Sequence, residues 1–373
     1  MIEYLTDVFS NYTLRTVILG TSGLGIVSGA LGVFAYLRKQ SLVGGVVSHS
    51  ALPGIVIAFL VTGSKAPSVL VLGAAIAGWL SMLLVNMITR TTRVKYDSAL
   101  GITLALFFGT GILLLIRVQM AGMSKKAGLE HYLFGMAATM SHENVLVIGG
   151  LGGLALILMF VFWKEFKVAS FDPDYTKSVG FSVHLIDTII TSLIVVAIVI
   201  GLEAVGVILM SAMVIIPAAA ARQWTNRLSL MVLISAVIGA AAGVGGTLIG
   251  DSGHHLATGP LIVLTATALF ILSLFFAPKR GMAIHWIRQW KRKRRMMHRQ
   301  IPALLHDLME RTKTKDDGWT IDVIRGLSPY KSGIDRVLNH LKSEGLVQQA
   351  NDLWFLTQKG VEYVGIDSKD HGG

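Results

Sequence analysis

The sequence predicts an all-α, polytopic membrane protein of about nine transmembrane helices, followed by a small α+β, winged helix-turn-helix-like cytoplasmic domain. Three observations predict this fold class. Hydrophobic residues make up 53% of the 373 residues, and the mean hydropathy is +0.63. Charged residues make up only 15%, against about 25% in typical soluble domains. Nine apolar segments precede residue 279, whereas the composition after residue 299 is that of a soluble domain.

The predicted spans follow one another from the N-terminal end. Apolar segments of about 17 residues or more can cross the hydrocarbon core of a bilayer. The first segment is too long for a cleavable signal peptide, so we count it as the first span. The sixth and seventh segments nearly abut, which leaves a re-entrant break open as an alternative there. We place the spans near 14–37, 43–62, 67–89, 99–117, 144–162, 183–200, 203–221, 228–249 and 259–277.

Glycines at four-residue spacing recur within these spans. Small residues at that spacing let two helix backbones approach closely in lipid, where burial of apolar surface alone favours no particular partner. The spacing therefore predicts a tightly packed bundle and carries no information about function. The pairs are Gly25 and Gly29, Gly149 and Gly153, Gly239 and Gly243, and Gly246 and Gly250.

The distribution of basic residues predicts the orientation of the bundle. Nine spans place the two termini on opposite sides of the membrane. If the C-terminus is cytoplasmic, the inner loops hold ten Lys and Arg residues and the outer loops hold four. This excess follows the positive-inside rule, so we expect a cytoplasmic C-terminus. The inner residues are Arg38, Lys39, Arg90, Arg93, Lys95, Lys164, Lys167, Lys177, Arg222 and Arg227.

Positive charge is concentrated just after the last span. The net charge of the chain is +11, and residues 279–299 hold nine Lys and Arg but no Asp or Glu. A basic run beside a span is typical of contact with an anionic membrane surface. We therefore divide the chain into a transmembrane domain, 1–278, a basic juxtamembrane linker, 279–299, and a cytoplasmic domain, 300–373.

The cytoplasmic domain resembles a winged helix-turn-helix module. Amphipathic periodicity predicts three helices, Gly345 ends the third, and an apolar strand and a turn follow at 353–360. The domain holds nine basic and eleven acidic residues, whereas DNA binding requires a basic footprint. We therefore favour a regulatory or docking role, with DNA an unlikely partner. The helices are expected at 303–311, 320–327 and 332–344.

A histidine lies inside the second predicted span, in segment 48–54 (SHSALPG). A histidine in a membrane segment is unfavourable unless it faces a cavity or a partner, which makes His49 a candidate metal ligand. Pro53 and Gly54 would loosen the helix and expose carbonyl groups that bind cations when they line a cavity. The alternative is a histidine that hydrogen-bonds a neighbouring helix and serves packing alone.

Carboxylates near the outer ends of the spans are weaker candidates. Glu203 is the sole carboxylate between Asp187 and Asp251, and it lies at a predicted span boundary. It is either a metal ligand in the outer half of a pathway or an interfacial residue that caps a helix. A further set of outer residues forms either a cation-attracting vestibule or ordinary solvated loops. The set is Glu130, His131, His142, Glu143, Asp251, His254 and His255.

Segment 171–180 (FDPDYTKSVG) predicts a short cytoplasmic helix between two spans. Asp172 is expected as its N-cap, Pro173 at its first position and Gly180 as its C-terminal stop. The alternative is an ordinary loop helix.

Two absences exclude several kinds of chemistry. The chain has no cysteine, so disulfides, thiolate metal ligands and thiol nucleophiles are excluded. A bound metal would meet oxygen, imidazole or thioether ligands. The chain also lacks the phosphate-binding loop G-x-x-x-x-G-K-[ST], and segment 63–65 (GSK) is only a fragment of it. An ATP-driven step would therefore need a separate ATPase polypeptide, and we do not expect an enzyme.

Several ordered motifs resemble those of one family. They are 41–54 (SLVGGVVSHSALPG), 132–135 (YLFG), 171–175 (FDPDY), 204–218 (AVGVILMSAMVIIPA) and 258–264 (TGPLIVL). Spread over roughly residues 12–278, they resemble the permeases of manganese, zinc and iron ABC importers, often called the ABC-3 family. The resemblance implies a type II ABC importer-like permease in a bacterial cell membrane, which imports a divalent transition metal by alternating access.

The second-span motif departs from the family pattern. In the family it usually reads Gly-Asp-Ala-x-Ser-His, and its Asp and His are taken to coordinate the metal. His49 matches the His, but Gly45 stands where the Asp would be. A lone imidazole is a poor ligand set for Mn²⁺, which favours carboxylate and carbonyl oxygens. The departure predicts a second, non-identical permease subunit that supplies the Asp, although carboxylates such as Glu203 offer an alternative compensation.

The resemblance also implies partners and cargo. A cytoplasmic ABC ATPase dimer would bind the ATP and dock on a coupling helix, and an extracytoplasmic metal-binding receptor would deliver the ion. The chain would hold no permanent cofactor. The absence of cysteine favours Mn²⁺ as cargo, with Zn²⁺ or Fe²⁺ as alternatives. The residues of the coupling helix would be Asp172, Pro173, Asp174, Tyr175 and Gly180.

Two other classes of function stay open from the sequence. A membrane-anchored, metal-responsive DNA-binding regulator is one, if the basic run 291–295 contributes to DNA binding. An ion-coupled secondary carrier is the other. A neighbouring reading frame that encodes a phosphate-loop ATPase would favour the importer, and its absence would favour the carrier.

Overall fold

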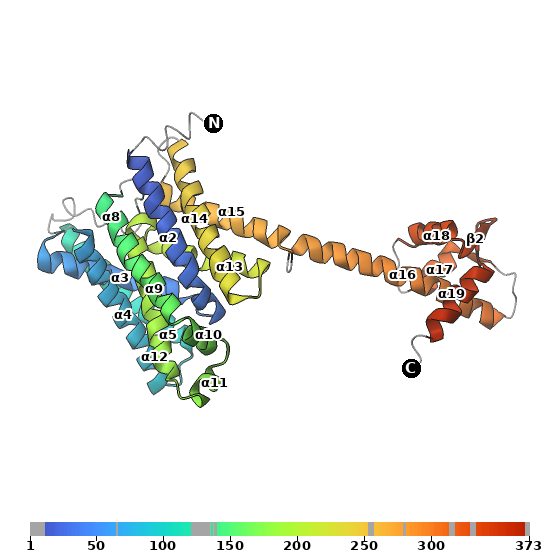
Figure 1. Ribbon diagram of the computed structural model, residues 1–373, viewed down its shortest axis with the longest axis horizontal. Helices are drawn as coiled ribbons and strands as arrows, with labels where there is room; N and C mark the ends of the chain where they lie inside the picture. Colours follow the sequence, from blue (N-terminus) through green and yellow to red (C-terminus); the bar gives the residue numbers. More distant parts are fainter. Residues whose placement is uncertain are drawn as a thin grey trace. The chain divides into compact units, whose positions relative to one another are not determined.

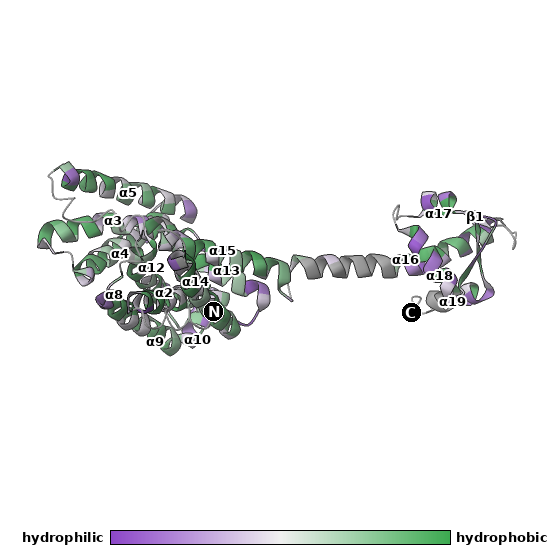
Figure 2. Ribbon diagram, turned by 90° about the horizontal axis from the view of Figure 1, so that it is seen from above, coloured by the Kyte–Doolittle hydropathy of each residue, from purple (hydrophilic) through white to green (hydrophobic). Residues whose placement is uncertain are grey.

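The computed structural model describes residues 12–64, 66–120, 135, 137, 140–252, 257–278, 281–312, 318–328 and 333–369. The chain divides into two compact units, residues 1–281 and residues 282–373 (Figure 1). The helices of the first unit are coloured mostly as apolar along their length, whereas those of the second unit mix polar and apolar residues (Figure 2). This contrast agrees with a first unit that is embedded in the membrane and a second unit that has the composition of a soluble domain.

The first unit is all-helical. Among the residues that the structure describes, eight helical stretches are long and apolar enough to cross a membrane. Helix α13 is a further apolar helix of 18 residues, so the expected polytopic bundle is confirmed. The elements are α2 (Tyr12–Leu37), α3 (Val43–Thr62), α4 (Pro67–Thr91), α5 (Tyr96–Met120), α8 (His142–Val147), the π-helical turn η2 (Ile148–Gly152), α9 (Gly153–Val161), α10 (Trp163–Phe171), α11 (Pro173–Ser178), α12 (Val183–Val205), α13 (Val207–Trp224), α14 (Leu228–Ser252) and α15 (Thr258–Phe276).

The break between the sixth and seventh spans lies later than the sequence indicated. Helix α12 continues through Leu202 and Val205, which are buried, and the chain turns at Gly206 with φ 93° and ψ 157°. A side chain at this positive φ would be strained. Gly135 packs so closely here that a Cβ atom on it would collide with the carbonyl of Val205. Glu203 therefore lies within the last turn of α12, not at the start of the next span.

Helices α2 and α14 pack closely against each other. A Cβ atom on Gly25 would overlap the carbonyl of Gly239, so the two backbones touch. The Ser235 hydroxyl donates to the carbonyl of Gly29 at 2.6 Å, and the hydroxyls of Thr21 and Thr247 lie 3.1 Å apart. Small residues and interhelical hydrogen bonds are the forces that join helices in lipid. By contrast, no atom in the described part of the chain lies within 4 Å of the Cβ positions of Gly149 and Gly153.

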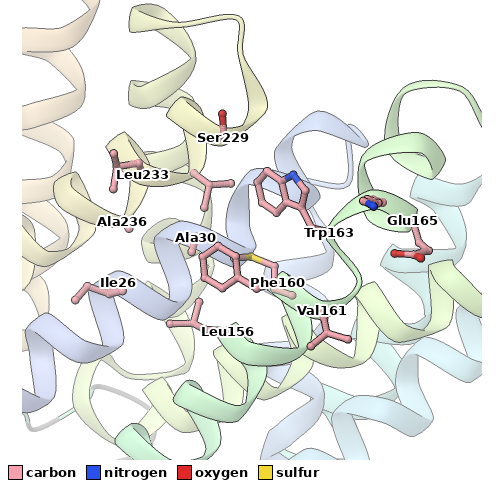
Figure 3. Close-up of a pocket in the computed structure, with 13 residues that line it drawn as sticks. Ile26, Ala30, Leu156, Phe160, Val161, Trp163, Glu165, Ser229, Leu233 and Ala236 are labelled. Carbon is pink, nitrogen blue, oxygen red and sulfur yellow. The ribbon is translucent and has the colours of Figure 1, made fainter.

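A groove of about 900 Å³ lies between α2, the α9–α10 segment and α14 (Figure 3). Its walls are largely apolar, with Ile26, Phe160 and Leu233 among them. Lys164, Glu165 and Ser229 are its polar members. One carboxylate without imidazole neighbours does not make a transition-metal site. The groove is therefore not a candidate metal pathway.

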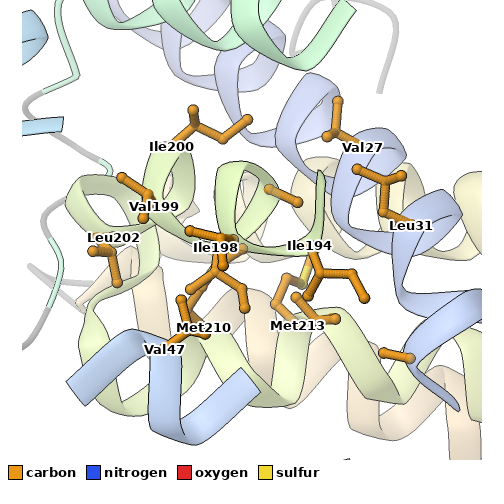
Figure 4. Packing of buried hydrophobic residues seen from close by; sticks show 14 of the residues in the cluster. Val27, Leu31, Val47, Ile194, Ile198, Val199, Ile200, Leu202, Met210 and Met213 are labelled. Carbon is orange, nitrogen blue, oxygen red and sulfur yellow. The ribbon is translucent and has the colours of Figure 1, made fainter. Parts of the chain in front are cut away.

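Helix α12 lies at the centre of the apolar core. Ile194 and Ile198 are almost fully buried, and they lie among Leu31 of α2, Val47 of α3 and Met213 of α13 (Figure 4). In lipid such packing favours helix association through van der Waals contact, and the interdigitated side chains fix where each helix lies. The core thereby fixes the position of α3, which carries the candidate site.

The second unit combines four helices with a three-stranded antiparallel sheet of order β1-β3-β2. Asn351 and Asp352 have positive φ, as in a two-residue hairpin turn. Ile301, Leu338, Leu341 and other apolar side chains form a core of its own. The elements are α16 (Met282–Thr312), β1 (Trp319–Thr320), α17 (Ile321–Leu327), α18 (Ile334–Ser343), β2 (Val347–Ala350), β3 (Leu353–Leu356) and α19 (Gln358–Lys369).

This arrangement contains the three expected helices and the expected strand at 353–356, with β1, β2 and α19 in addition. The turn expected at 358–360 is wrong, because helix α19 begins at Gln358. The designation of this unit as a winged helix stays a prediction. The helix expected at 303–311 is longer than expected, because α16 begins at Met282 and includes the basic run 291–295. Lys and Arg favour helices, and no glycine or proline interrupts the chain between Met282 and Pro302. The basic segment is therefore helical from Met282 onward.

Candidate functional site

His49 lies on α3, which packs against α4, α5 and α13. Its imidazole meets the ring of Phe108 on α5 edge to face, with 4.8 Å between centroids and 78° between planes. Its Nδ1 atom is buried and has no hydrogen-bond partner among the residues that the structure describes. A buried nitrogen is unfavourable without a hydrogen-bond or metal partner, so the Nδ1 atom is a possible ligand atom. The packing alternative, in which His49 hydrogen-bonds a neighbouring helix, finds no support at Nδ1 among the described residues.

Gly45 lies one turn before His49 on the same helix, and residues four apart share a face. No atom of the described residues lies within 4 Å of the position that a Cβ on Gly45 would take. The neighbouring Gly44 is different, because its Cβ would lie 3.2 Å from the Cα of Ser211 on α13. Helix α3 therefore packs α13 through Gly44 and has open space at Gly45.

Helix α3 stays continuous through Pro53. The expected loosening at Pro53 and Gly54 is therefore not a break in the helix. Proline has no N–H, so the carbonyl of His49 cannot accept the usual helical bond from position 53. Gly54 packs backbone to backbone on Gly73 of α4. The carbonyl that lacks this helical bond thus belongs to the same residue as the candidate imidazole.

Three hydroxyl groups add to the polar character of this region. Ser48 and Ser50 on α3 and Thr103 on α5 are fully buried. Their oxygens lack hydrogen-bond partners within the described part of the chain. Thr103 and Phe108 were not identified from the sequence, because nothing in the apolar pattern of α5 indicates which residues face α3. Ser50 belongs to the second-span motif but carried no prediction.

Among the described residues, no other candidate ligand is seen in contact with His49. Glu203 lies in the last turn of α12, and the structure describes its backbone alone. His142 and Glu143, in the first turn of α8, and Asp251, in the last turn of α14, are exposed. Glu130, His131, His254 and His255 lie outside the described residues. The vestibule stays a prediction.

Helix α11 has the caps that its sequence predicts. The Asp172 carboxylate accepts a hydrogen bond from the Tyr175 N–H at 2.9 Å, and Pro173 occupies the first helical turn. Gly180 follows the helix with φ 91°. Thr176 is buried and donates to the carbonyl of Asp172 at 2.8 Å. These bonds fix a compact helix between α10 and α12.

Large apolar side chains on and beside α11 are exposed. Tyr175 is 57% exposed, and Phe171, Val179 and Phe181 are exposed to a similar extent. Asp174 pairs with Lys177 at 3.2 Å on the solvent side. Large exposed apolar side chains around one short, rigid helix are typical of a protein-binding surface. We call these four residues the α11 apolar rim.

Comparison with known proteins gives consistent matches. The model of the ABC 3 transport family matches residues 10–277. The manganese transport system membrane protein MntC of Bacillus subtilis (strain 168) is 42% identical over 363 residues, which cover 97% of this chain and 83% of that protein. The zinc transport system membrane protein TroC of Treponema pallidum (strain Nichols) is 46% identical over 290 residues, covering 78% of this chain and 96% of that protein.

Solved structures give the same result. A chain of PsaBC from Streptococcus pneumoniae, in complex with Fab, is similar with a TM-score of 0.67 and 33% identity, covering 75% of this chain and 98% of that one. A metal-chelate type ABC transporter in an inward-facing conformation has a TM-score of 0.55 at 18% identity, which shows a shared fold.

Proposed function

Because the chain belongs to the ABC 3 transport family, we propose that it is the pore-forming permease subunit of an ATP-driven importer of a divalent transition metal. It is a multi-pass membrane protein, and manganese is the favoured cargo, with zinc as the alternative. This choice rests on relatives whose names give manganese or zinc and on donors that suit either ion. The DNA-binding regulator and the secondary carrier are not favoured.

The observation that carries the proposal is the face of α3 that contains Gly45 and His49. It combines an imidazole Nδ1 atom without a partner among the described residues, a carbonyl that receives no helical bond from Pro53, and open space at the partly exposed Gly45. A polar face of this kind on a membrane helix could hold a dehydrated cation during transport. His49 is the proposed metal ligand, and Glu203 is a second candidate.

A non-identical second permease subunit is the proposed partner at this face. The open space beside Gly45 leaves room for a carboxylate from another chain. One imidazole and one carbonyl do not satisfy Mn²⁺, whereas added carboxylate oxygens would. Two copies of this chain would bring two imidazoles and no acid at this position.

Helix α11 is the proposed docking element for an ATPase dimer. Its caps hold it rigid, and its apolar rim supplies contact area. A rigid element transmits the displacement that follows ATP binding to α10 and α12, which flank it. With the C-terminus in the cytoplasm, the same topology places α11 at the inner face. A metal-binding receptor would deliver the ion to the outer face.

Metal uptake tests the assignment of His49. Cells that depend on this system for manganese would express either His49→Ala or the matched control His306→Ala, which alters a histidine of α16. We expect His49→Ala to abolish most uptake at normal membrane abundance, because the cation loses its imidazole ligand. His306→Ala should transport normally. Normal uptake by His49→Ala would remove the residue from the pathway.

Mass measurement of the purified complex tests the subunit composition. The tagged chain would be purified with its native neighbours and weighed intact. We expect one copy of this chain, one different permease and two ATPase subunits. Two copies of this chain with full transport activity would refute the non-identical partner.

A further inference from the structure

A second cluster of possible metal ligands lies in the C-terminal unit, outside the transmembrane bundle. It consists of His298 on α16, His340 in the last turn of α18 and Glu344, which caps that helix. One ligand atom from each residue lies within 4.8 Å of the other two. We propose that these three residues bind a divalent transition-metal ion.

The distances are close to those of an occupied site. Nδ1 of His340 lies 3.3 Å from the Glu344 carboxylate, and Nδ1 of His298 lies 4.0 Å from it. Donor atoms bound at about 2.1 Å around one ion lie roughly 3.0 to 3.4 Å apart. Small side-chain rotations, well within the reach of partly exposed residues, bring the third donor into range. The two imidazole rings meet edge to face with centroids 4.7 Å apart.

The backbone beneath the cluster is held by the core of the unit. Ile301 on α16 and Val337 and Leu341 on α18 are almost fully buried and belong to one apolar cluster. His298 therefore lies one turn from a buried anchor, and His340 lies between two of them. The end of α18 is fixed as well, because the Glu344 N–H donates to the carbonyl of His340 at 3.1 Å. The ligands thus occupy defined positions on two packed helices.

The donor set determines the class of ion. Two imidazoles and one carboxylate suit Zn²⁺, Fe²⁺ and related transition metals, and three protein ligands leave positions for water. Mg²⁺ and Ca²⁺ prefer oxygen ligands alone. The ammonium groups of two nearby lysines bind other groups than the Glu344 carboxylate. Lys342 donates to the Gln349 side chain at 3.1 Å, and Lys359 donates to the main-chain carbonyl of Glu344 at 3.1 Å.

A bound ion would join α16 to α18 in the unit that follows the last span. Metal occupancy would therefore stabilise this unit against unfolding. The site binds the class of ion that the proposed function assigns as cargo, but the binding itself does not depend on transport.

Metal titration of the purified full-length chain in lipid nanodiscs tests the site. Every variant would carry His49→Ala, so that the proposed pathway lacks its imidazole ligand. Co²⁺ would be the probe, because its visible absorption reports bound imidazole and carboxylate. We expect the His49→Ala chain to bind one Co²⁺. Adding His340→Ala should abolish this binding. Adding Glu344→Gln, which keeps the shape of the side chain, should weaken it at least about tenfold.

His306→Ala is the matched control, because His306 lies two turns beyond His298 on the same helix and is not part of the cluster. It should bind Co²⁺ as tightly as the parent. Circular dichroism without metal would establish that each variant is folded, and added Co²⁺ should raise the unfolding temperature of the parent and of His306→Ala alone. Equal binding by the parent and His340→Ala, or no binding by the parent, would overturn the proposal. Transport is not measured, so failure here leaves the importer assignment intact.

Discussion

The guanidinium of Arg38, just after α2, donates a hydrogen bond to the carboxylate of Asp187 in α12. The Arg38 side chain is only 10% exposed, whereas Asp187 is 40% exposed. The ion pair therefore joins two transmembrane helices at the end of the bundle where α11 lies. Removing the carboxylate leaves a largely buried positive charge without its partner.

We expect Asp187→Ala to lower the free energy of unfolding by about 1–3 kcal/mol, the usual effect of leaving a buried polar group unsatisfied. Thermal unfolding of the chain in detergent would measure this change. Asp174→Ala is the control, because Asp174 is 94% exposed in its pair with Lys177, and exposed pairs contribute little. Equal unfolding temperatures for the two variants would show that the Arg38–Asp187 pair does not contribute to the stability of the folded chain.

If the apolar rim of α11 binds the ATPase, a substitution in it should weaken transport and ATPase binding without changing the stability of the chain. Tyr175→Ala should reduce transport and ATPase association severalfold while leaving the unfolding temperature unchanged, because the exposed ring contributes little to folding. Lys177→Ala, on the same helix, should have a smaller effect. Uptake, co-purification of the ATPase and thermal unfolding would be measured together. Loss of stability in Tyr175→Ala would indicate that the ring is structural.

The absence of cysteine allows a direct test of the same contact. A single cysteine at position 174 or 175 is unique in the chain. We expect each to form a crosslink with a cysteine on the ATPase. Labelling of these cysteines exclusively from outside the cell would contradict both the interface and the inward orientation.

Hydropathy predicted the transmembrane helices because lipid requires every span to be long, apolar and internally hydrogen-bonded. It could not place helix breaks, since these depend on single backbone conformations. The sequence suggested a boundary before Glu203, yet the chain turns at Gly206, where Gly135 packs on it. The π-helical turn at Ile148–Gly152 likewise interrupts a segment that reads as one uniform apolar helix.

The candidate site was only partly predictable for a related reason. His49 could be identified because a histidine in a span is unfavourable without a role. Phe108 and Thr103 could not, because no local pattern encodes which residues of α5 face α3. His298, His340 and Glu344 come from two helices well separated in sequence, and only the packing of α16 on α18 brings them together.

Removal of the C-terminal unit tests whether the transmembrane unit is self-sufficient. The unit boundary at residue 281 is a better cutting point than residue 299, which lies inside α16. We expect a chain ending at Gly281 to insert and to assemble with its partner subunits, since the two units have separate apolar cores. Its transport rate should differ from that of the full chain. Correct insertion without assembly would show that the second unit is structural.

The open space at Gly45 gives the most specific prediction about the metal site. Gly45→Asp would place a carboxylate one turn from His49, where none of the described residues obstructs a Cβ. Gly45→Ala is the matched control, because it adds the Cβ without the carboxylate, and alanine in place of glycine within a helix is favourable by about 1 kcal/mol. Both variants would also carry His340→Ala, so that binding at the C-terminal cluster is not counted.

We expect Gly45→Asp to bind Mn²⁺ at least about tenfold more tightly than Gly45→Ala, because a carboxylate supplies the hard oxygen donor that an imidazole does not. Titration of the purified chains would measure this difference, and uptake would be measured in parallel. Tighter binding of the ion in the resting state also raises the free-energy barrier to its release. Binding energy accelerates transport only when it is greater in the transition state than in the resting state. Slower uptake by Gly45→Asp would therefore indicate that glycine at this position favours release of the ion. Equal affinities for the two variants would place the metal elsewhere than beside His49.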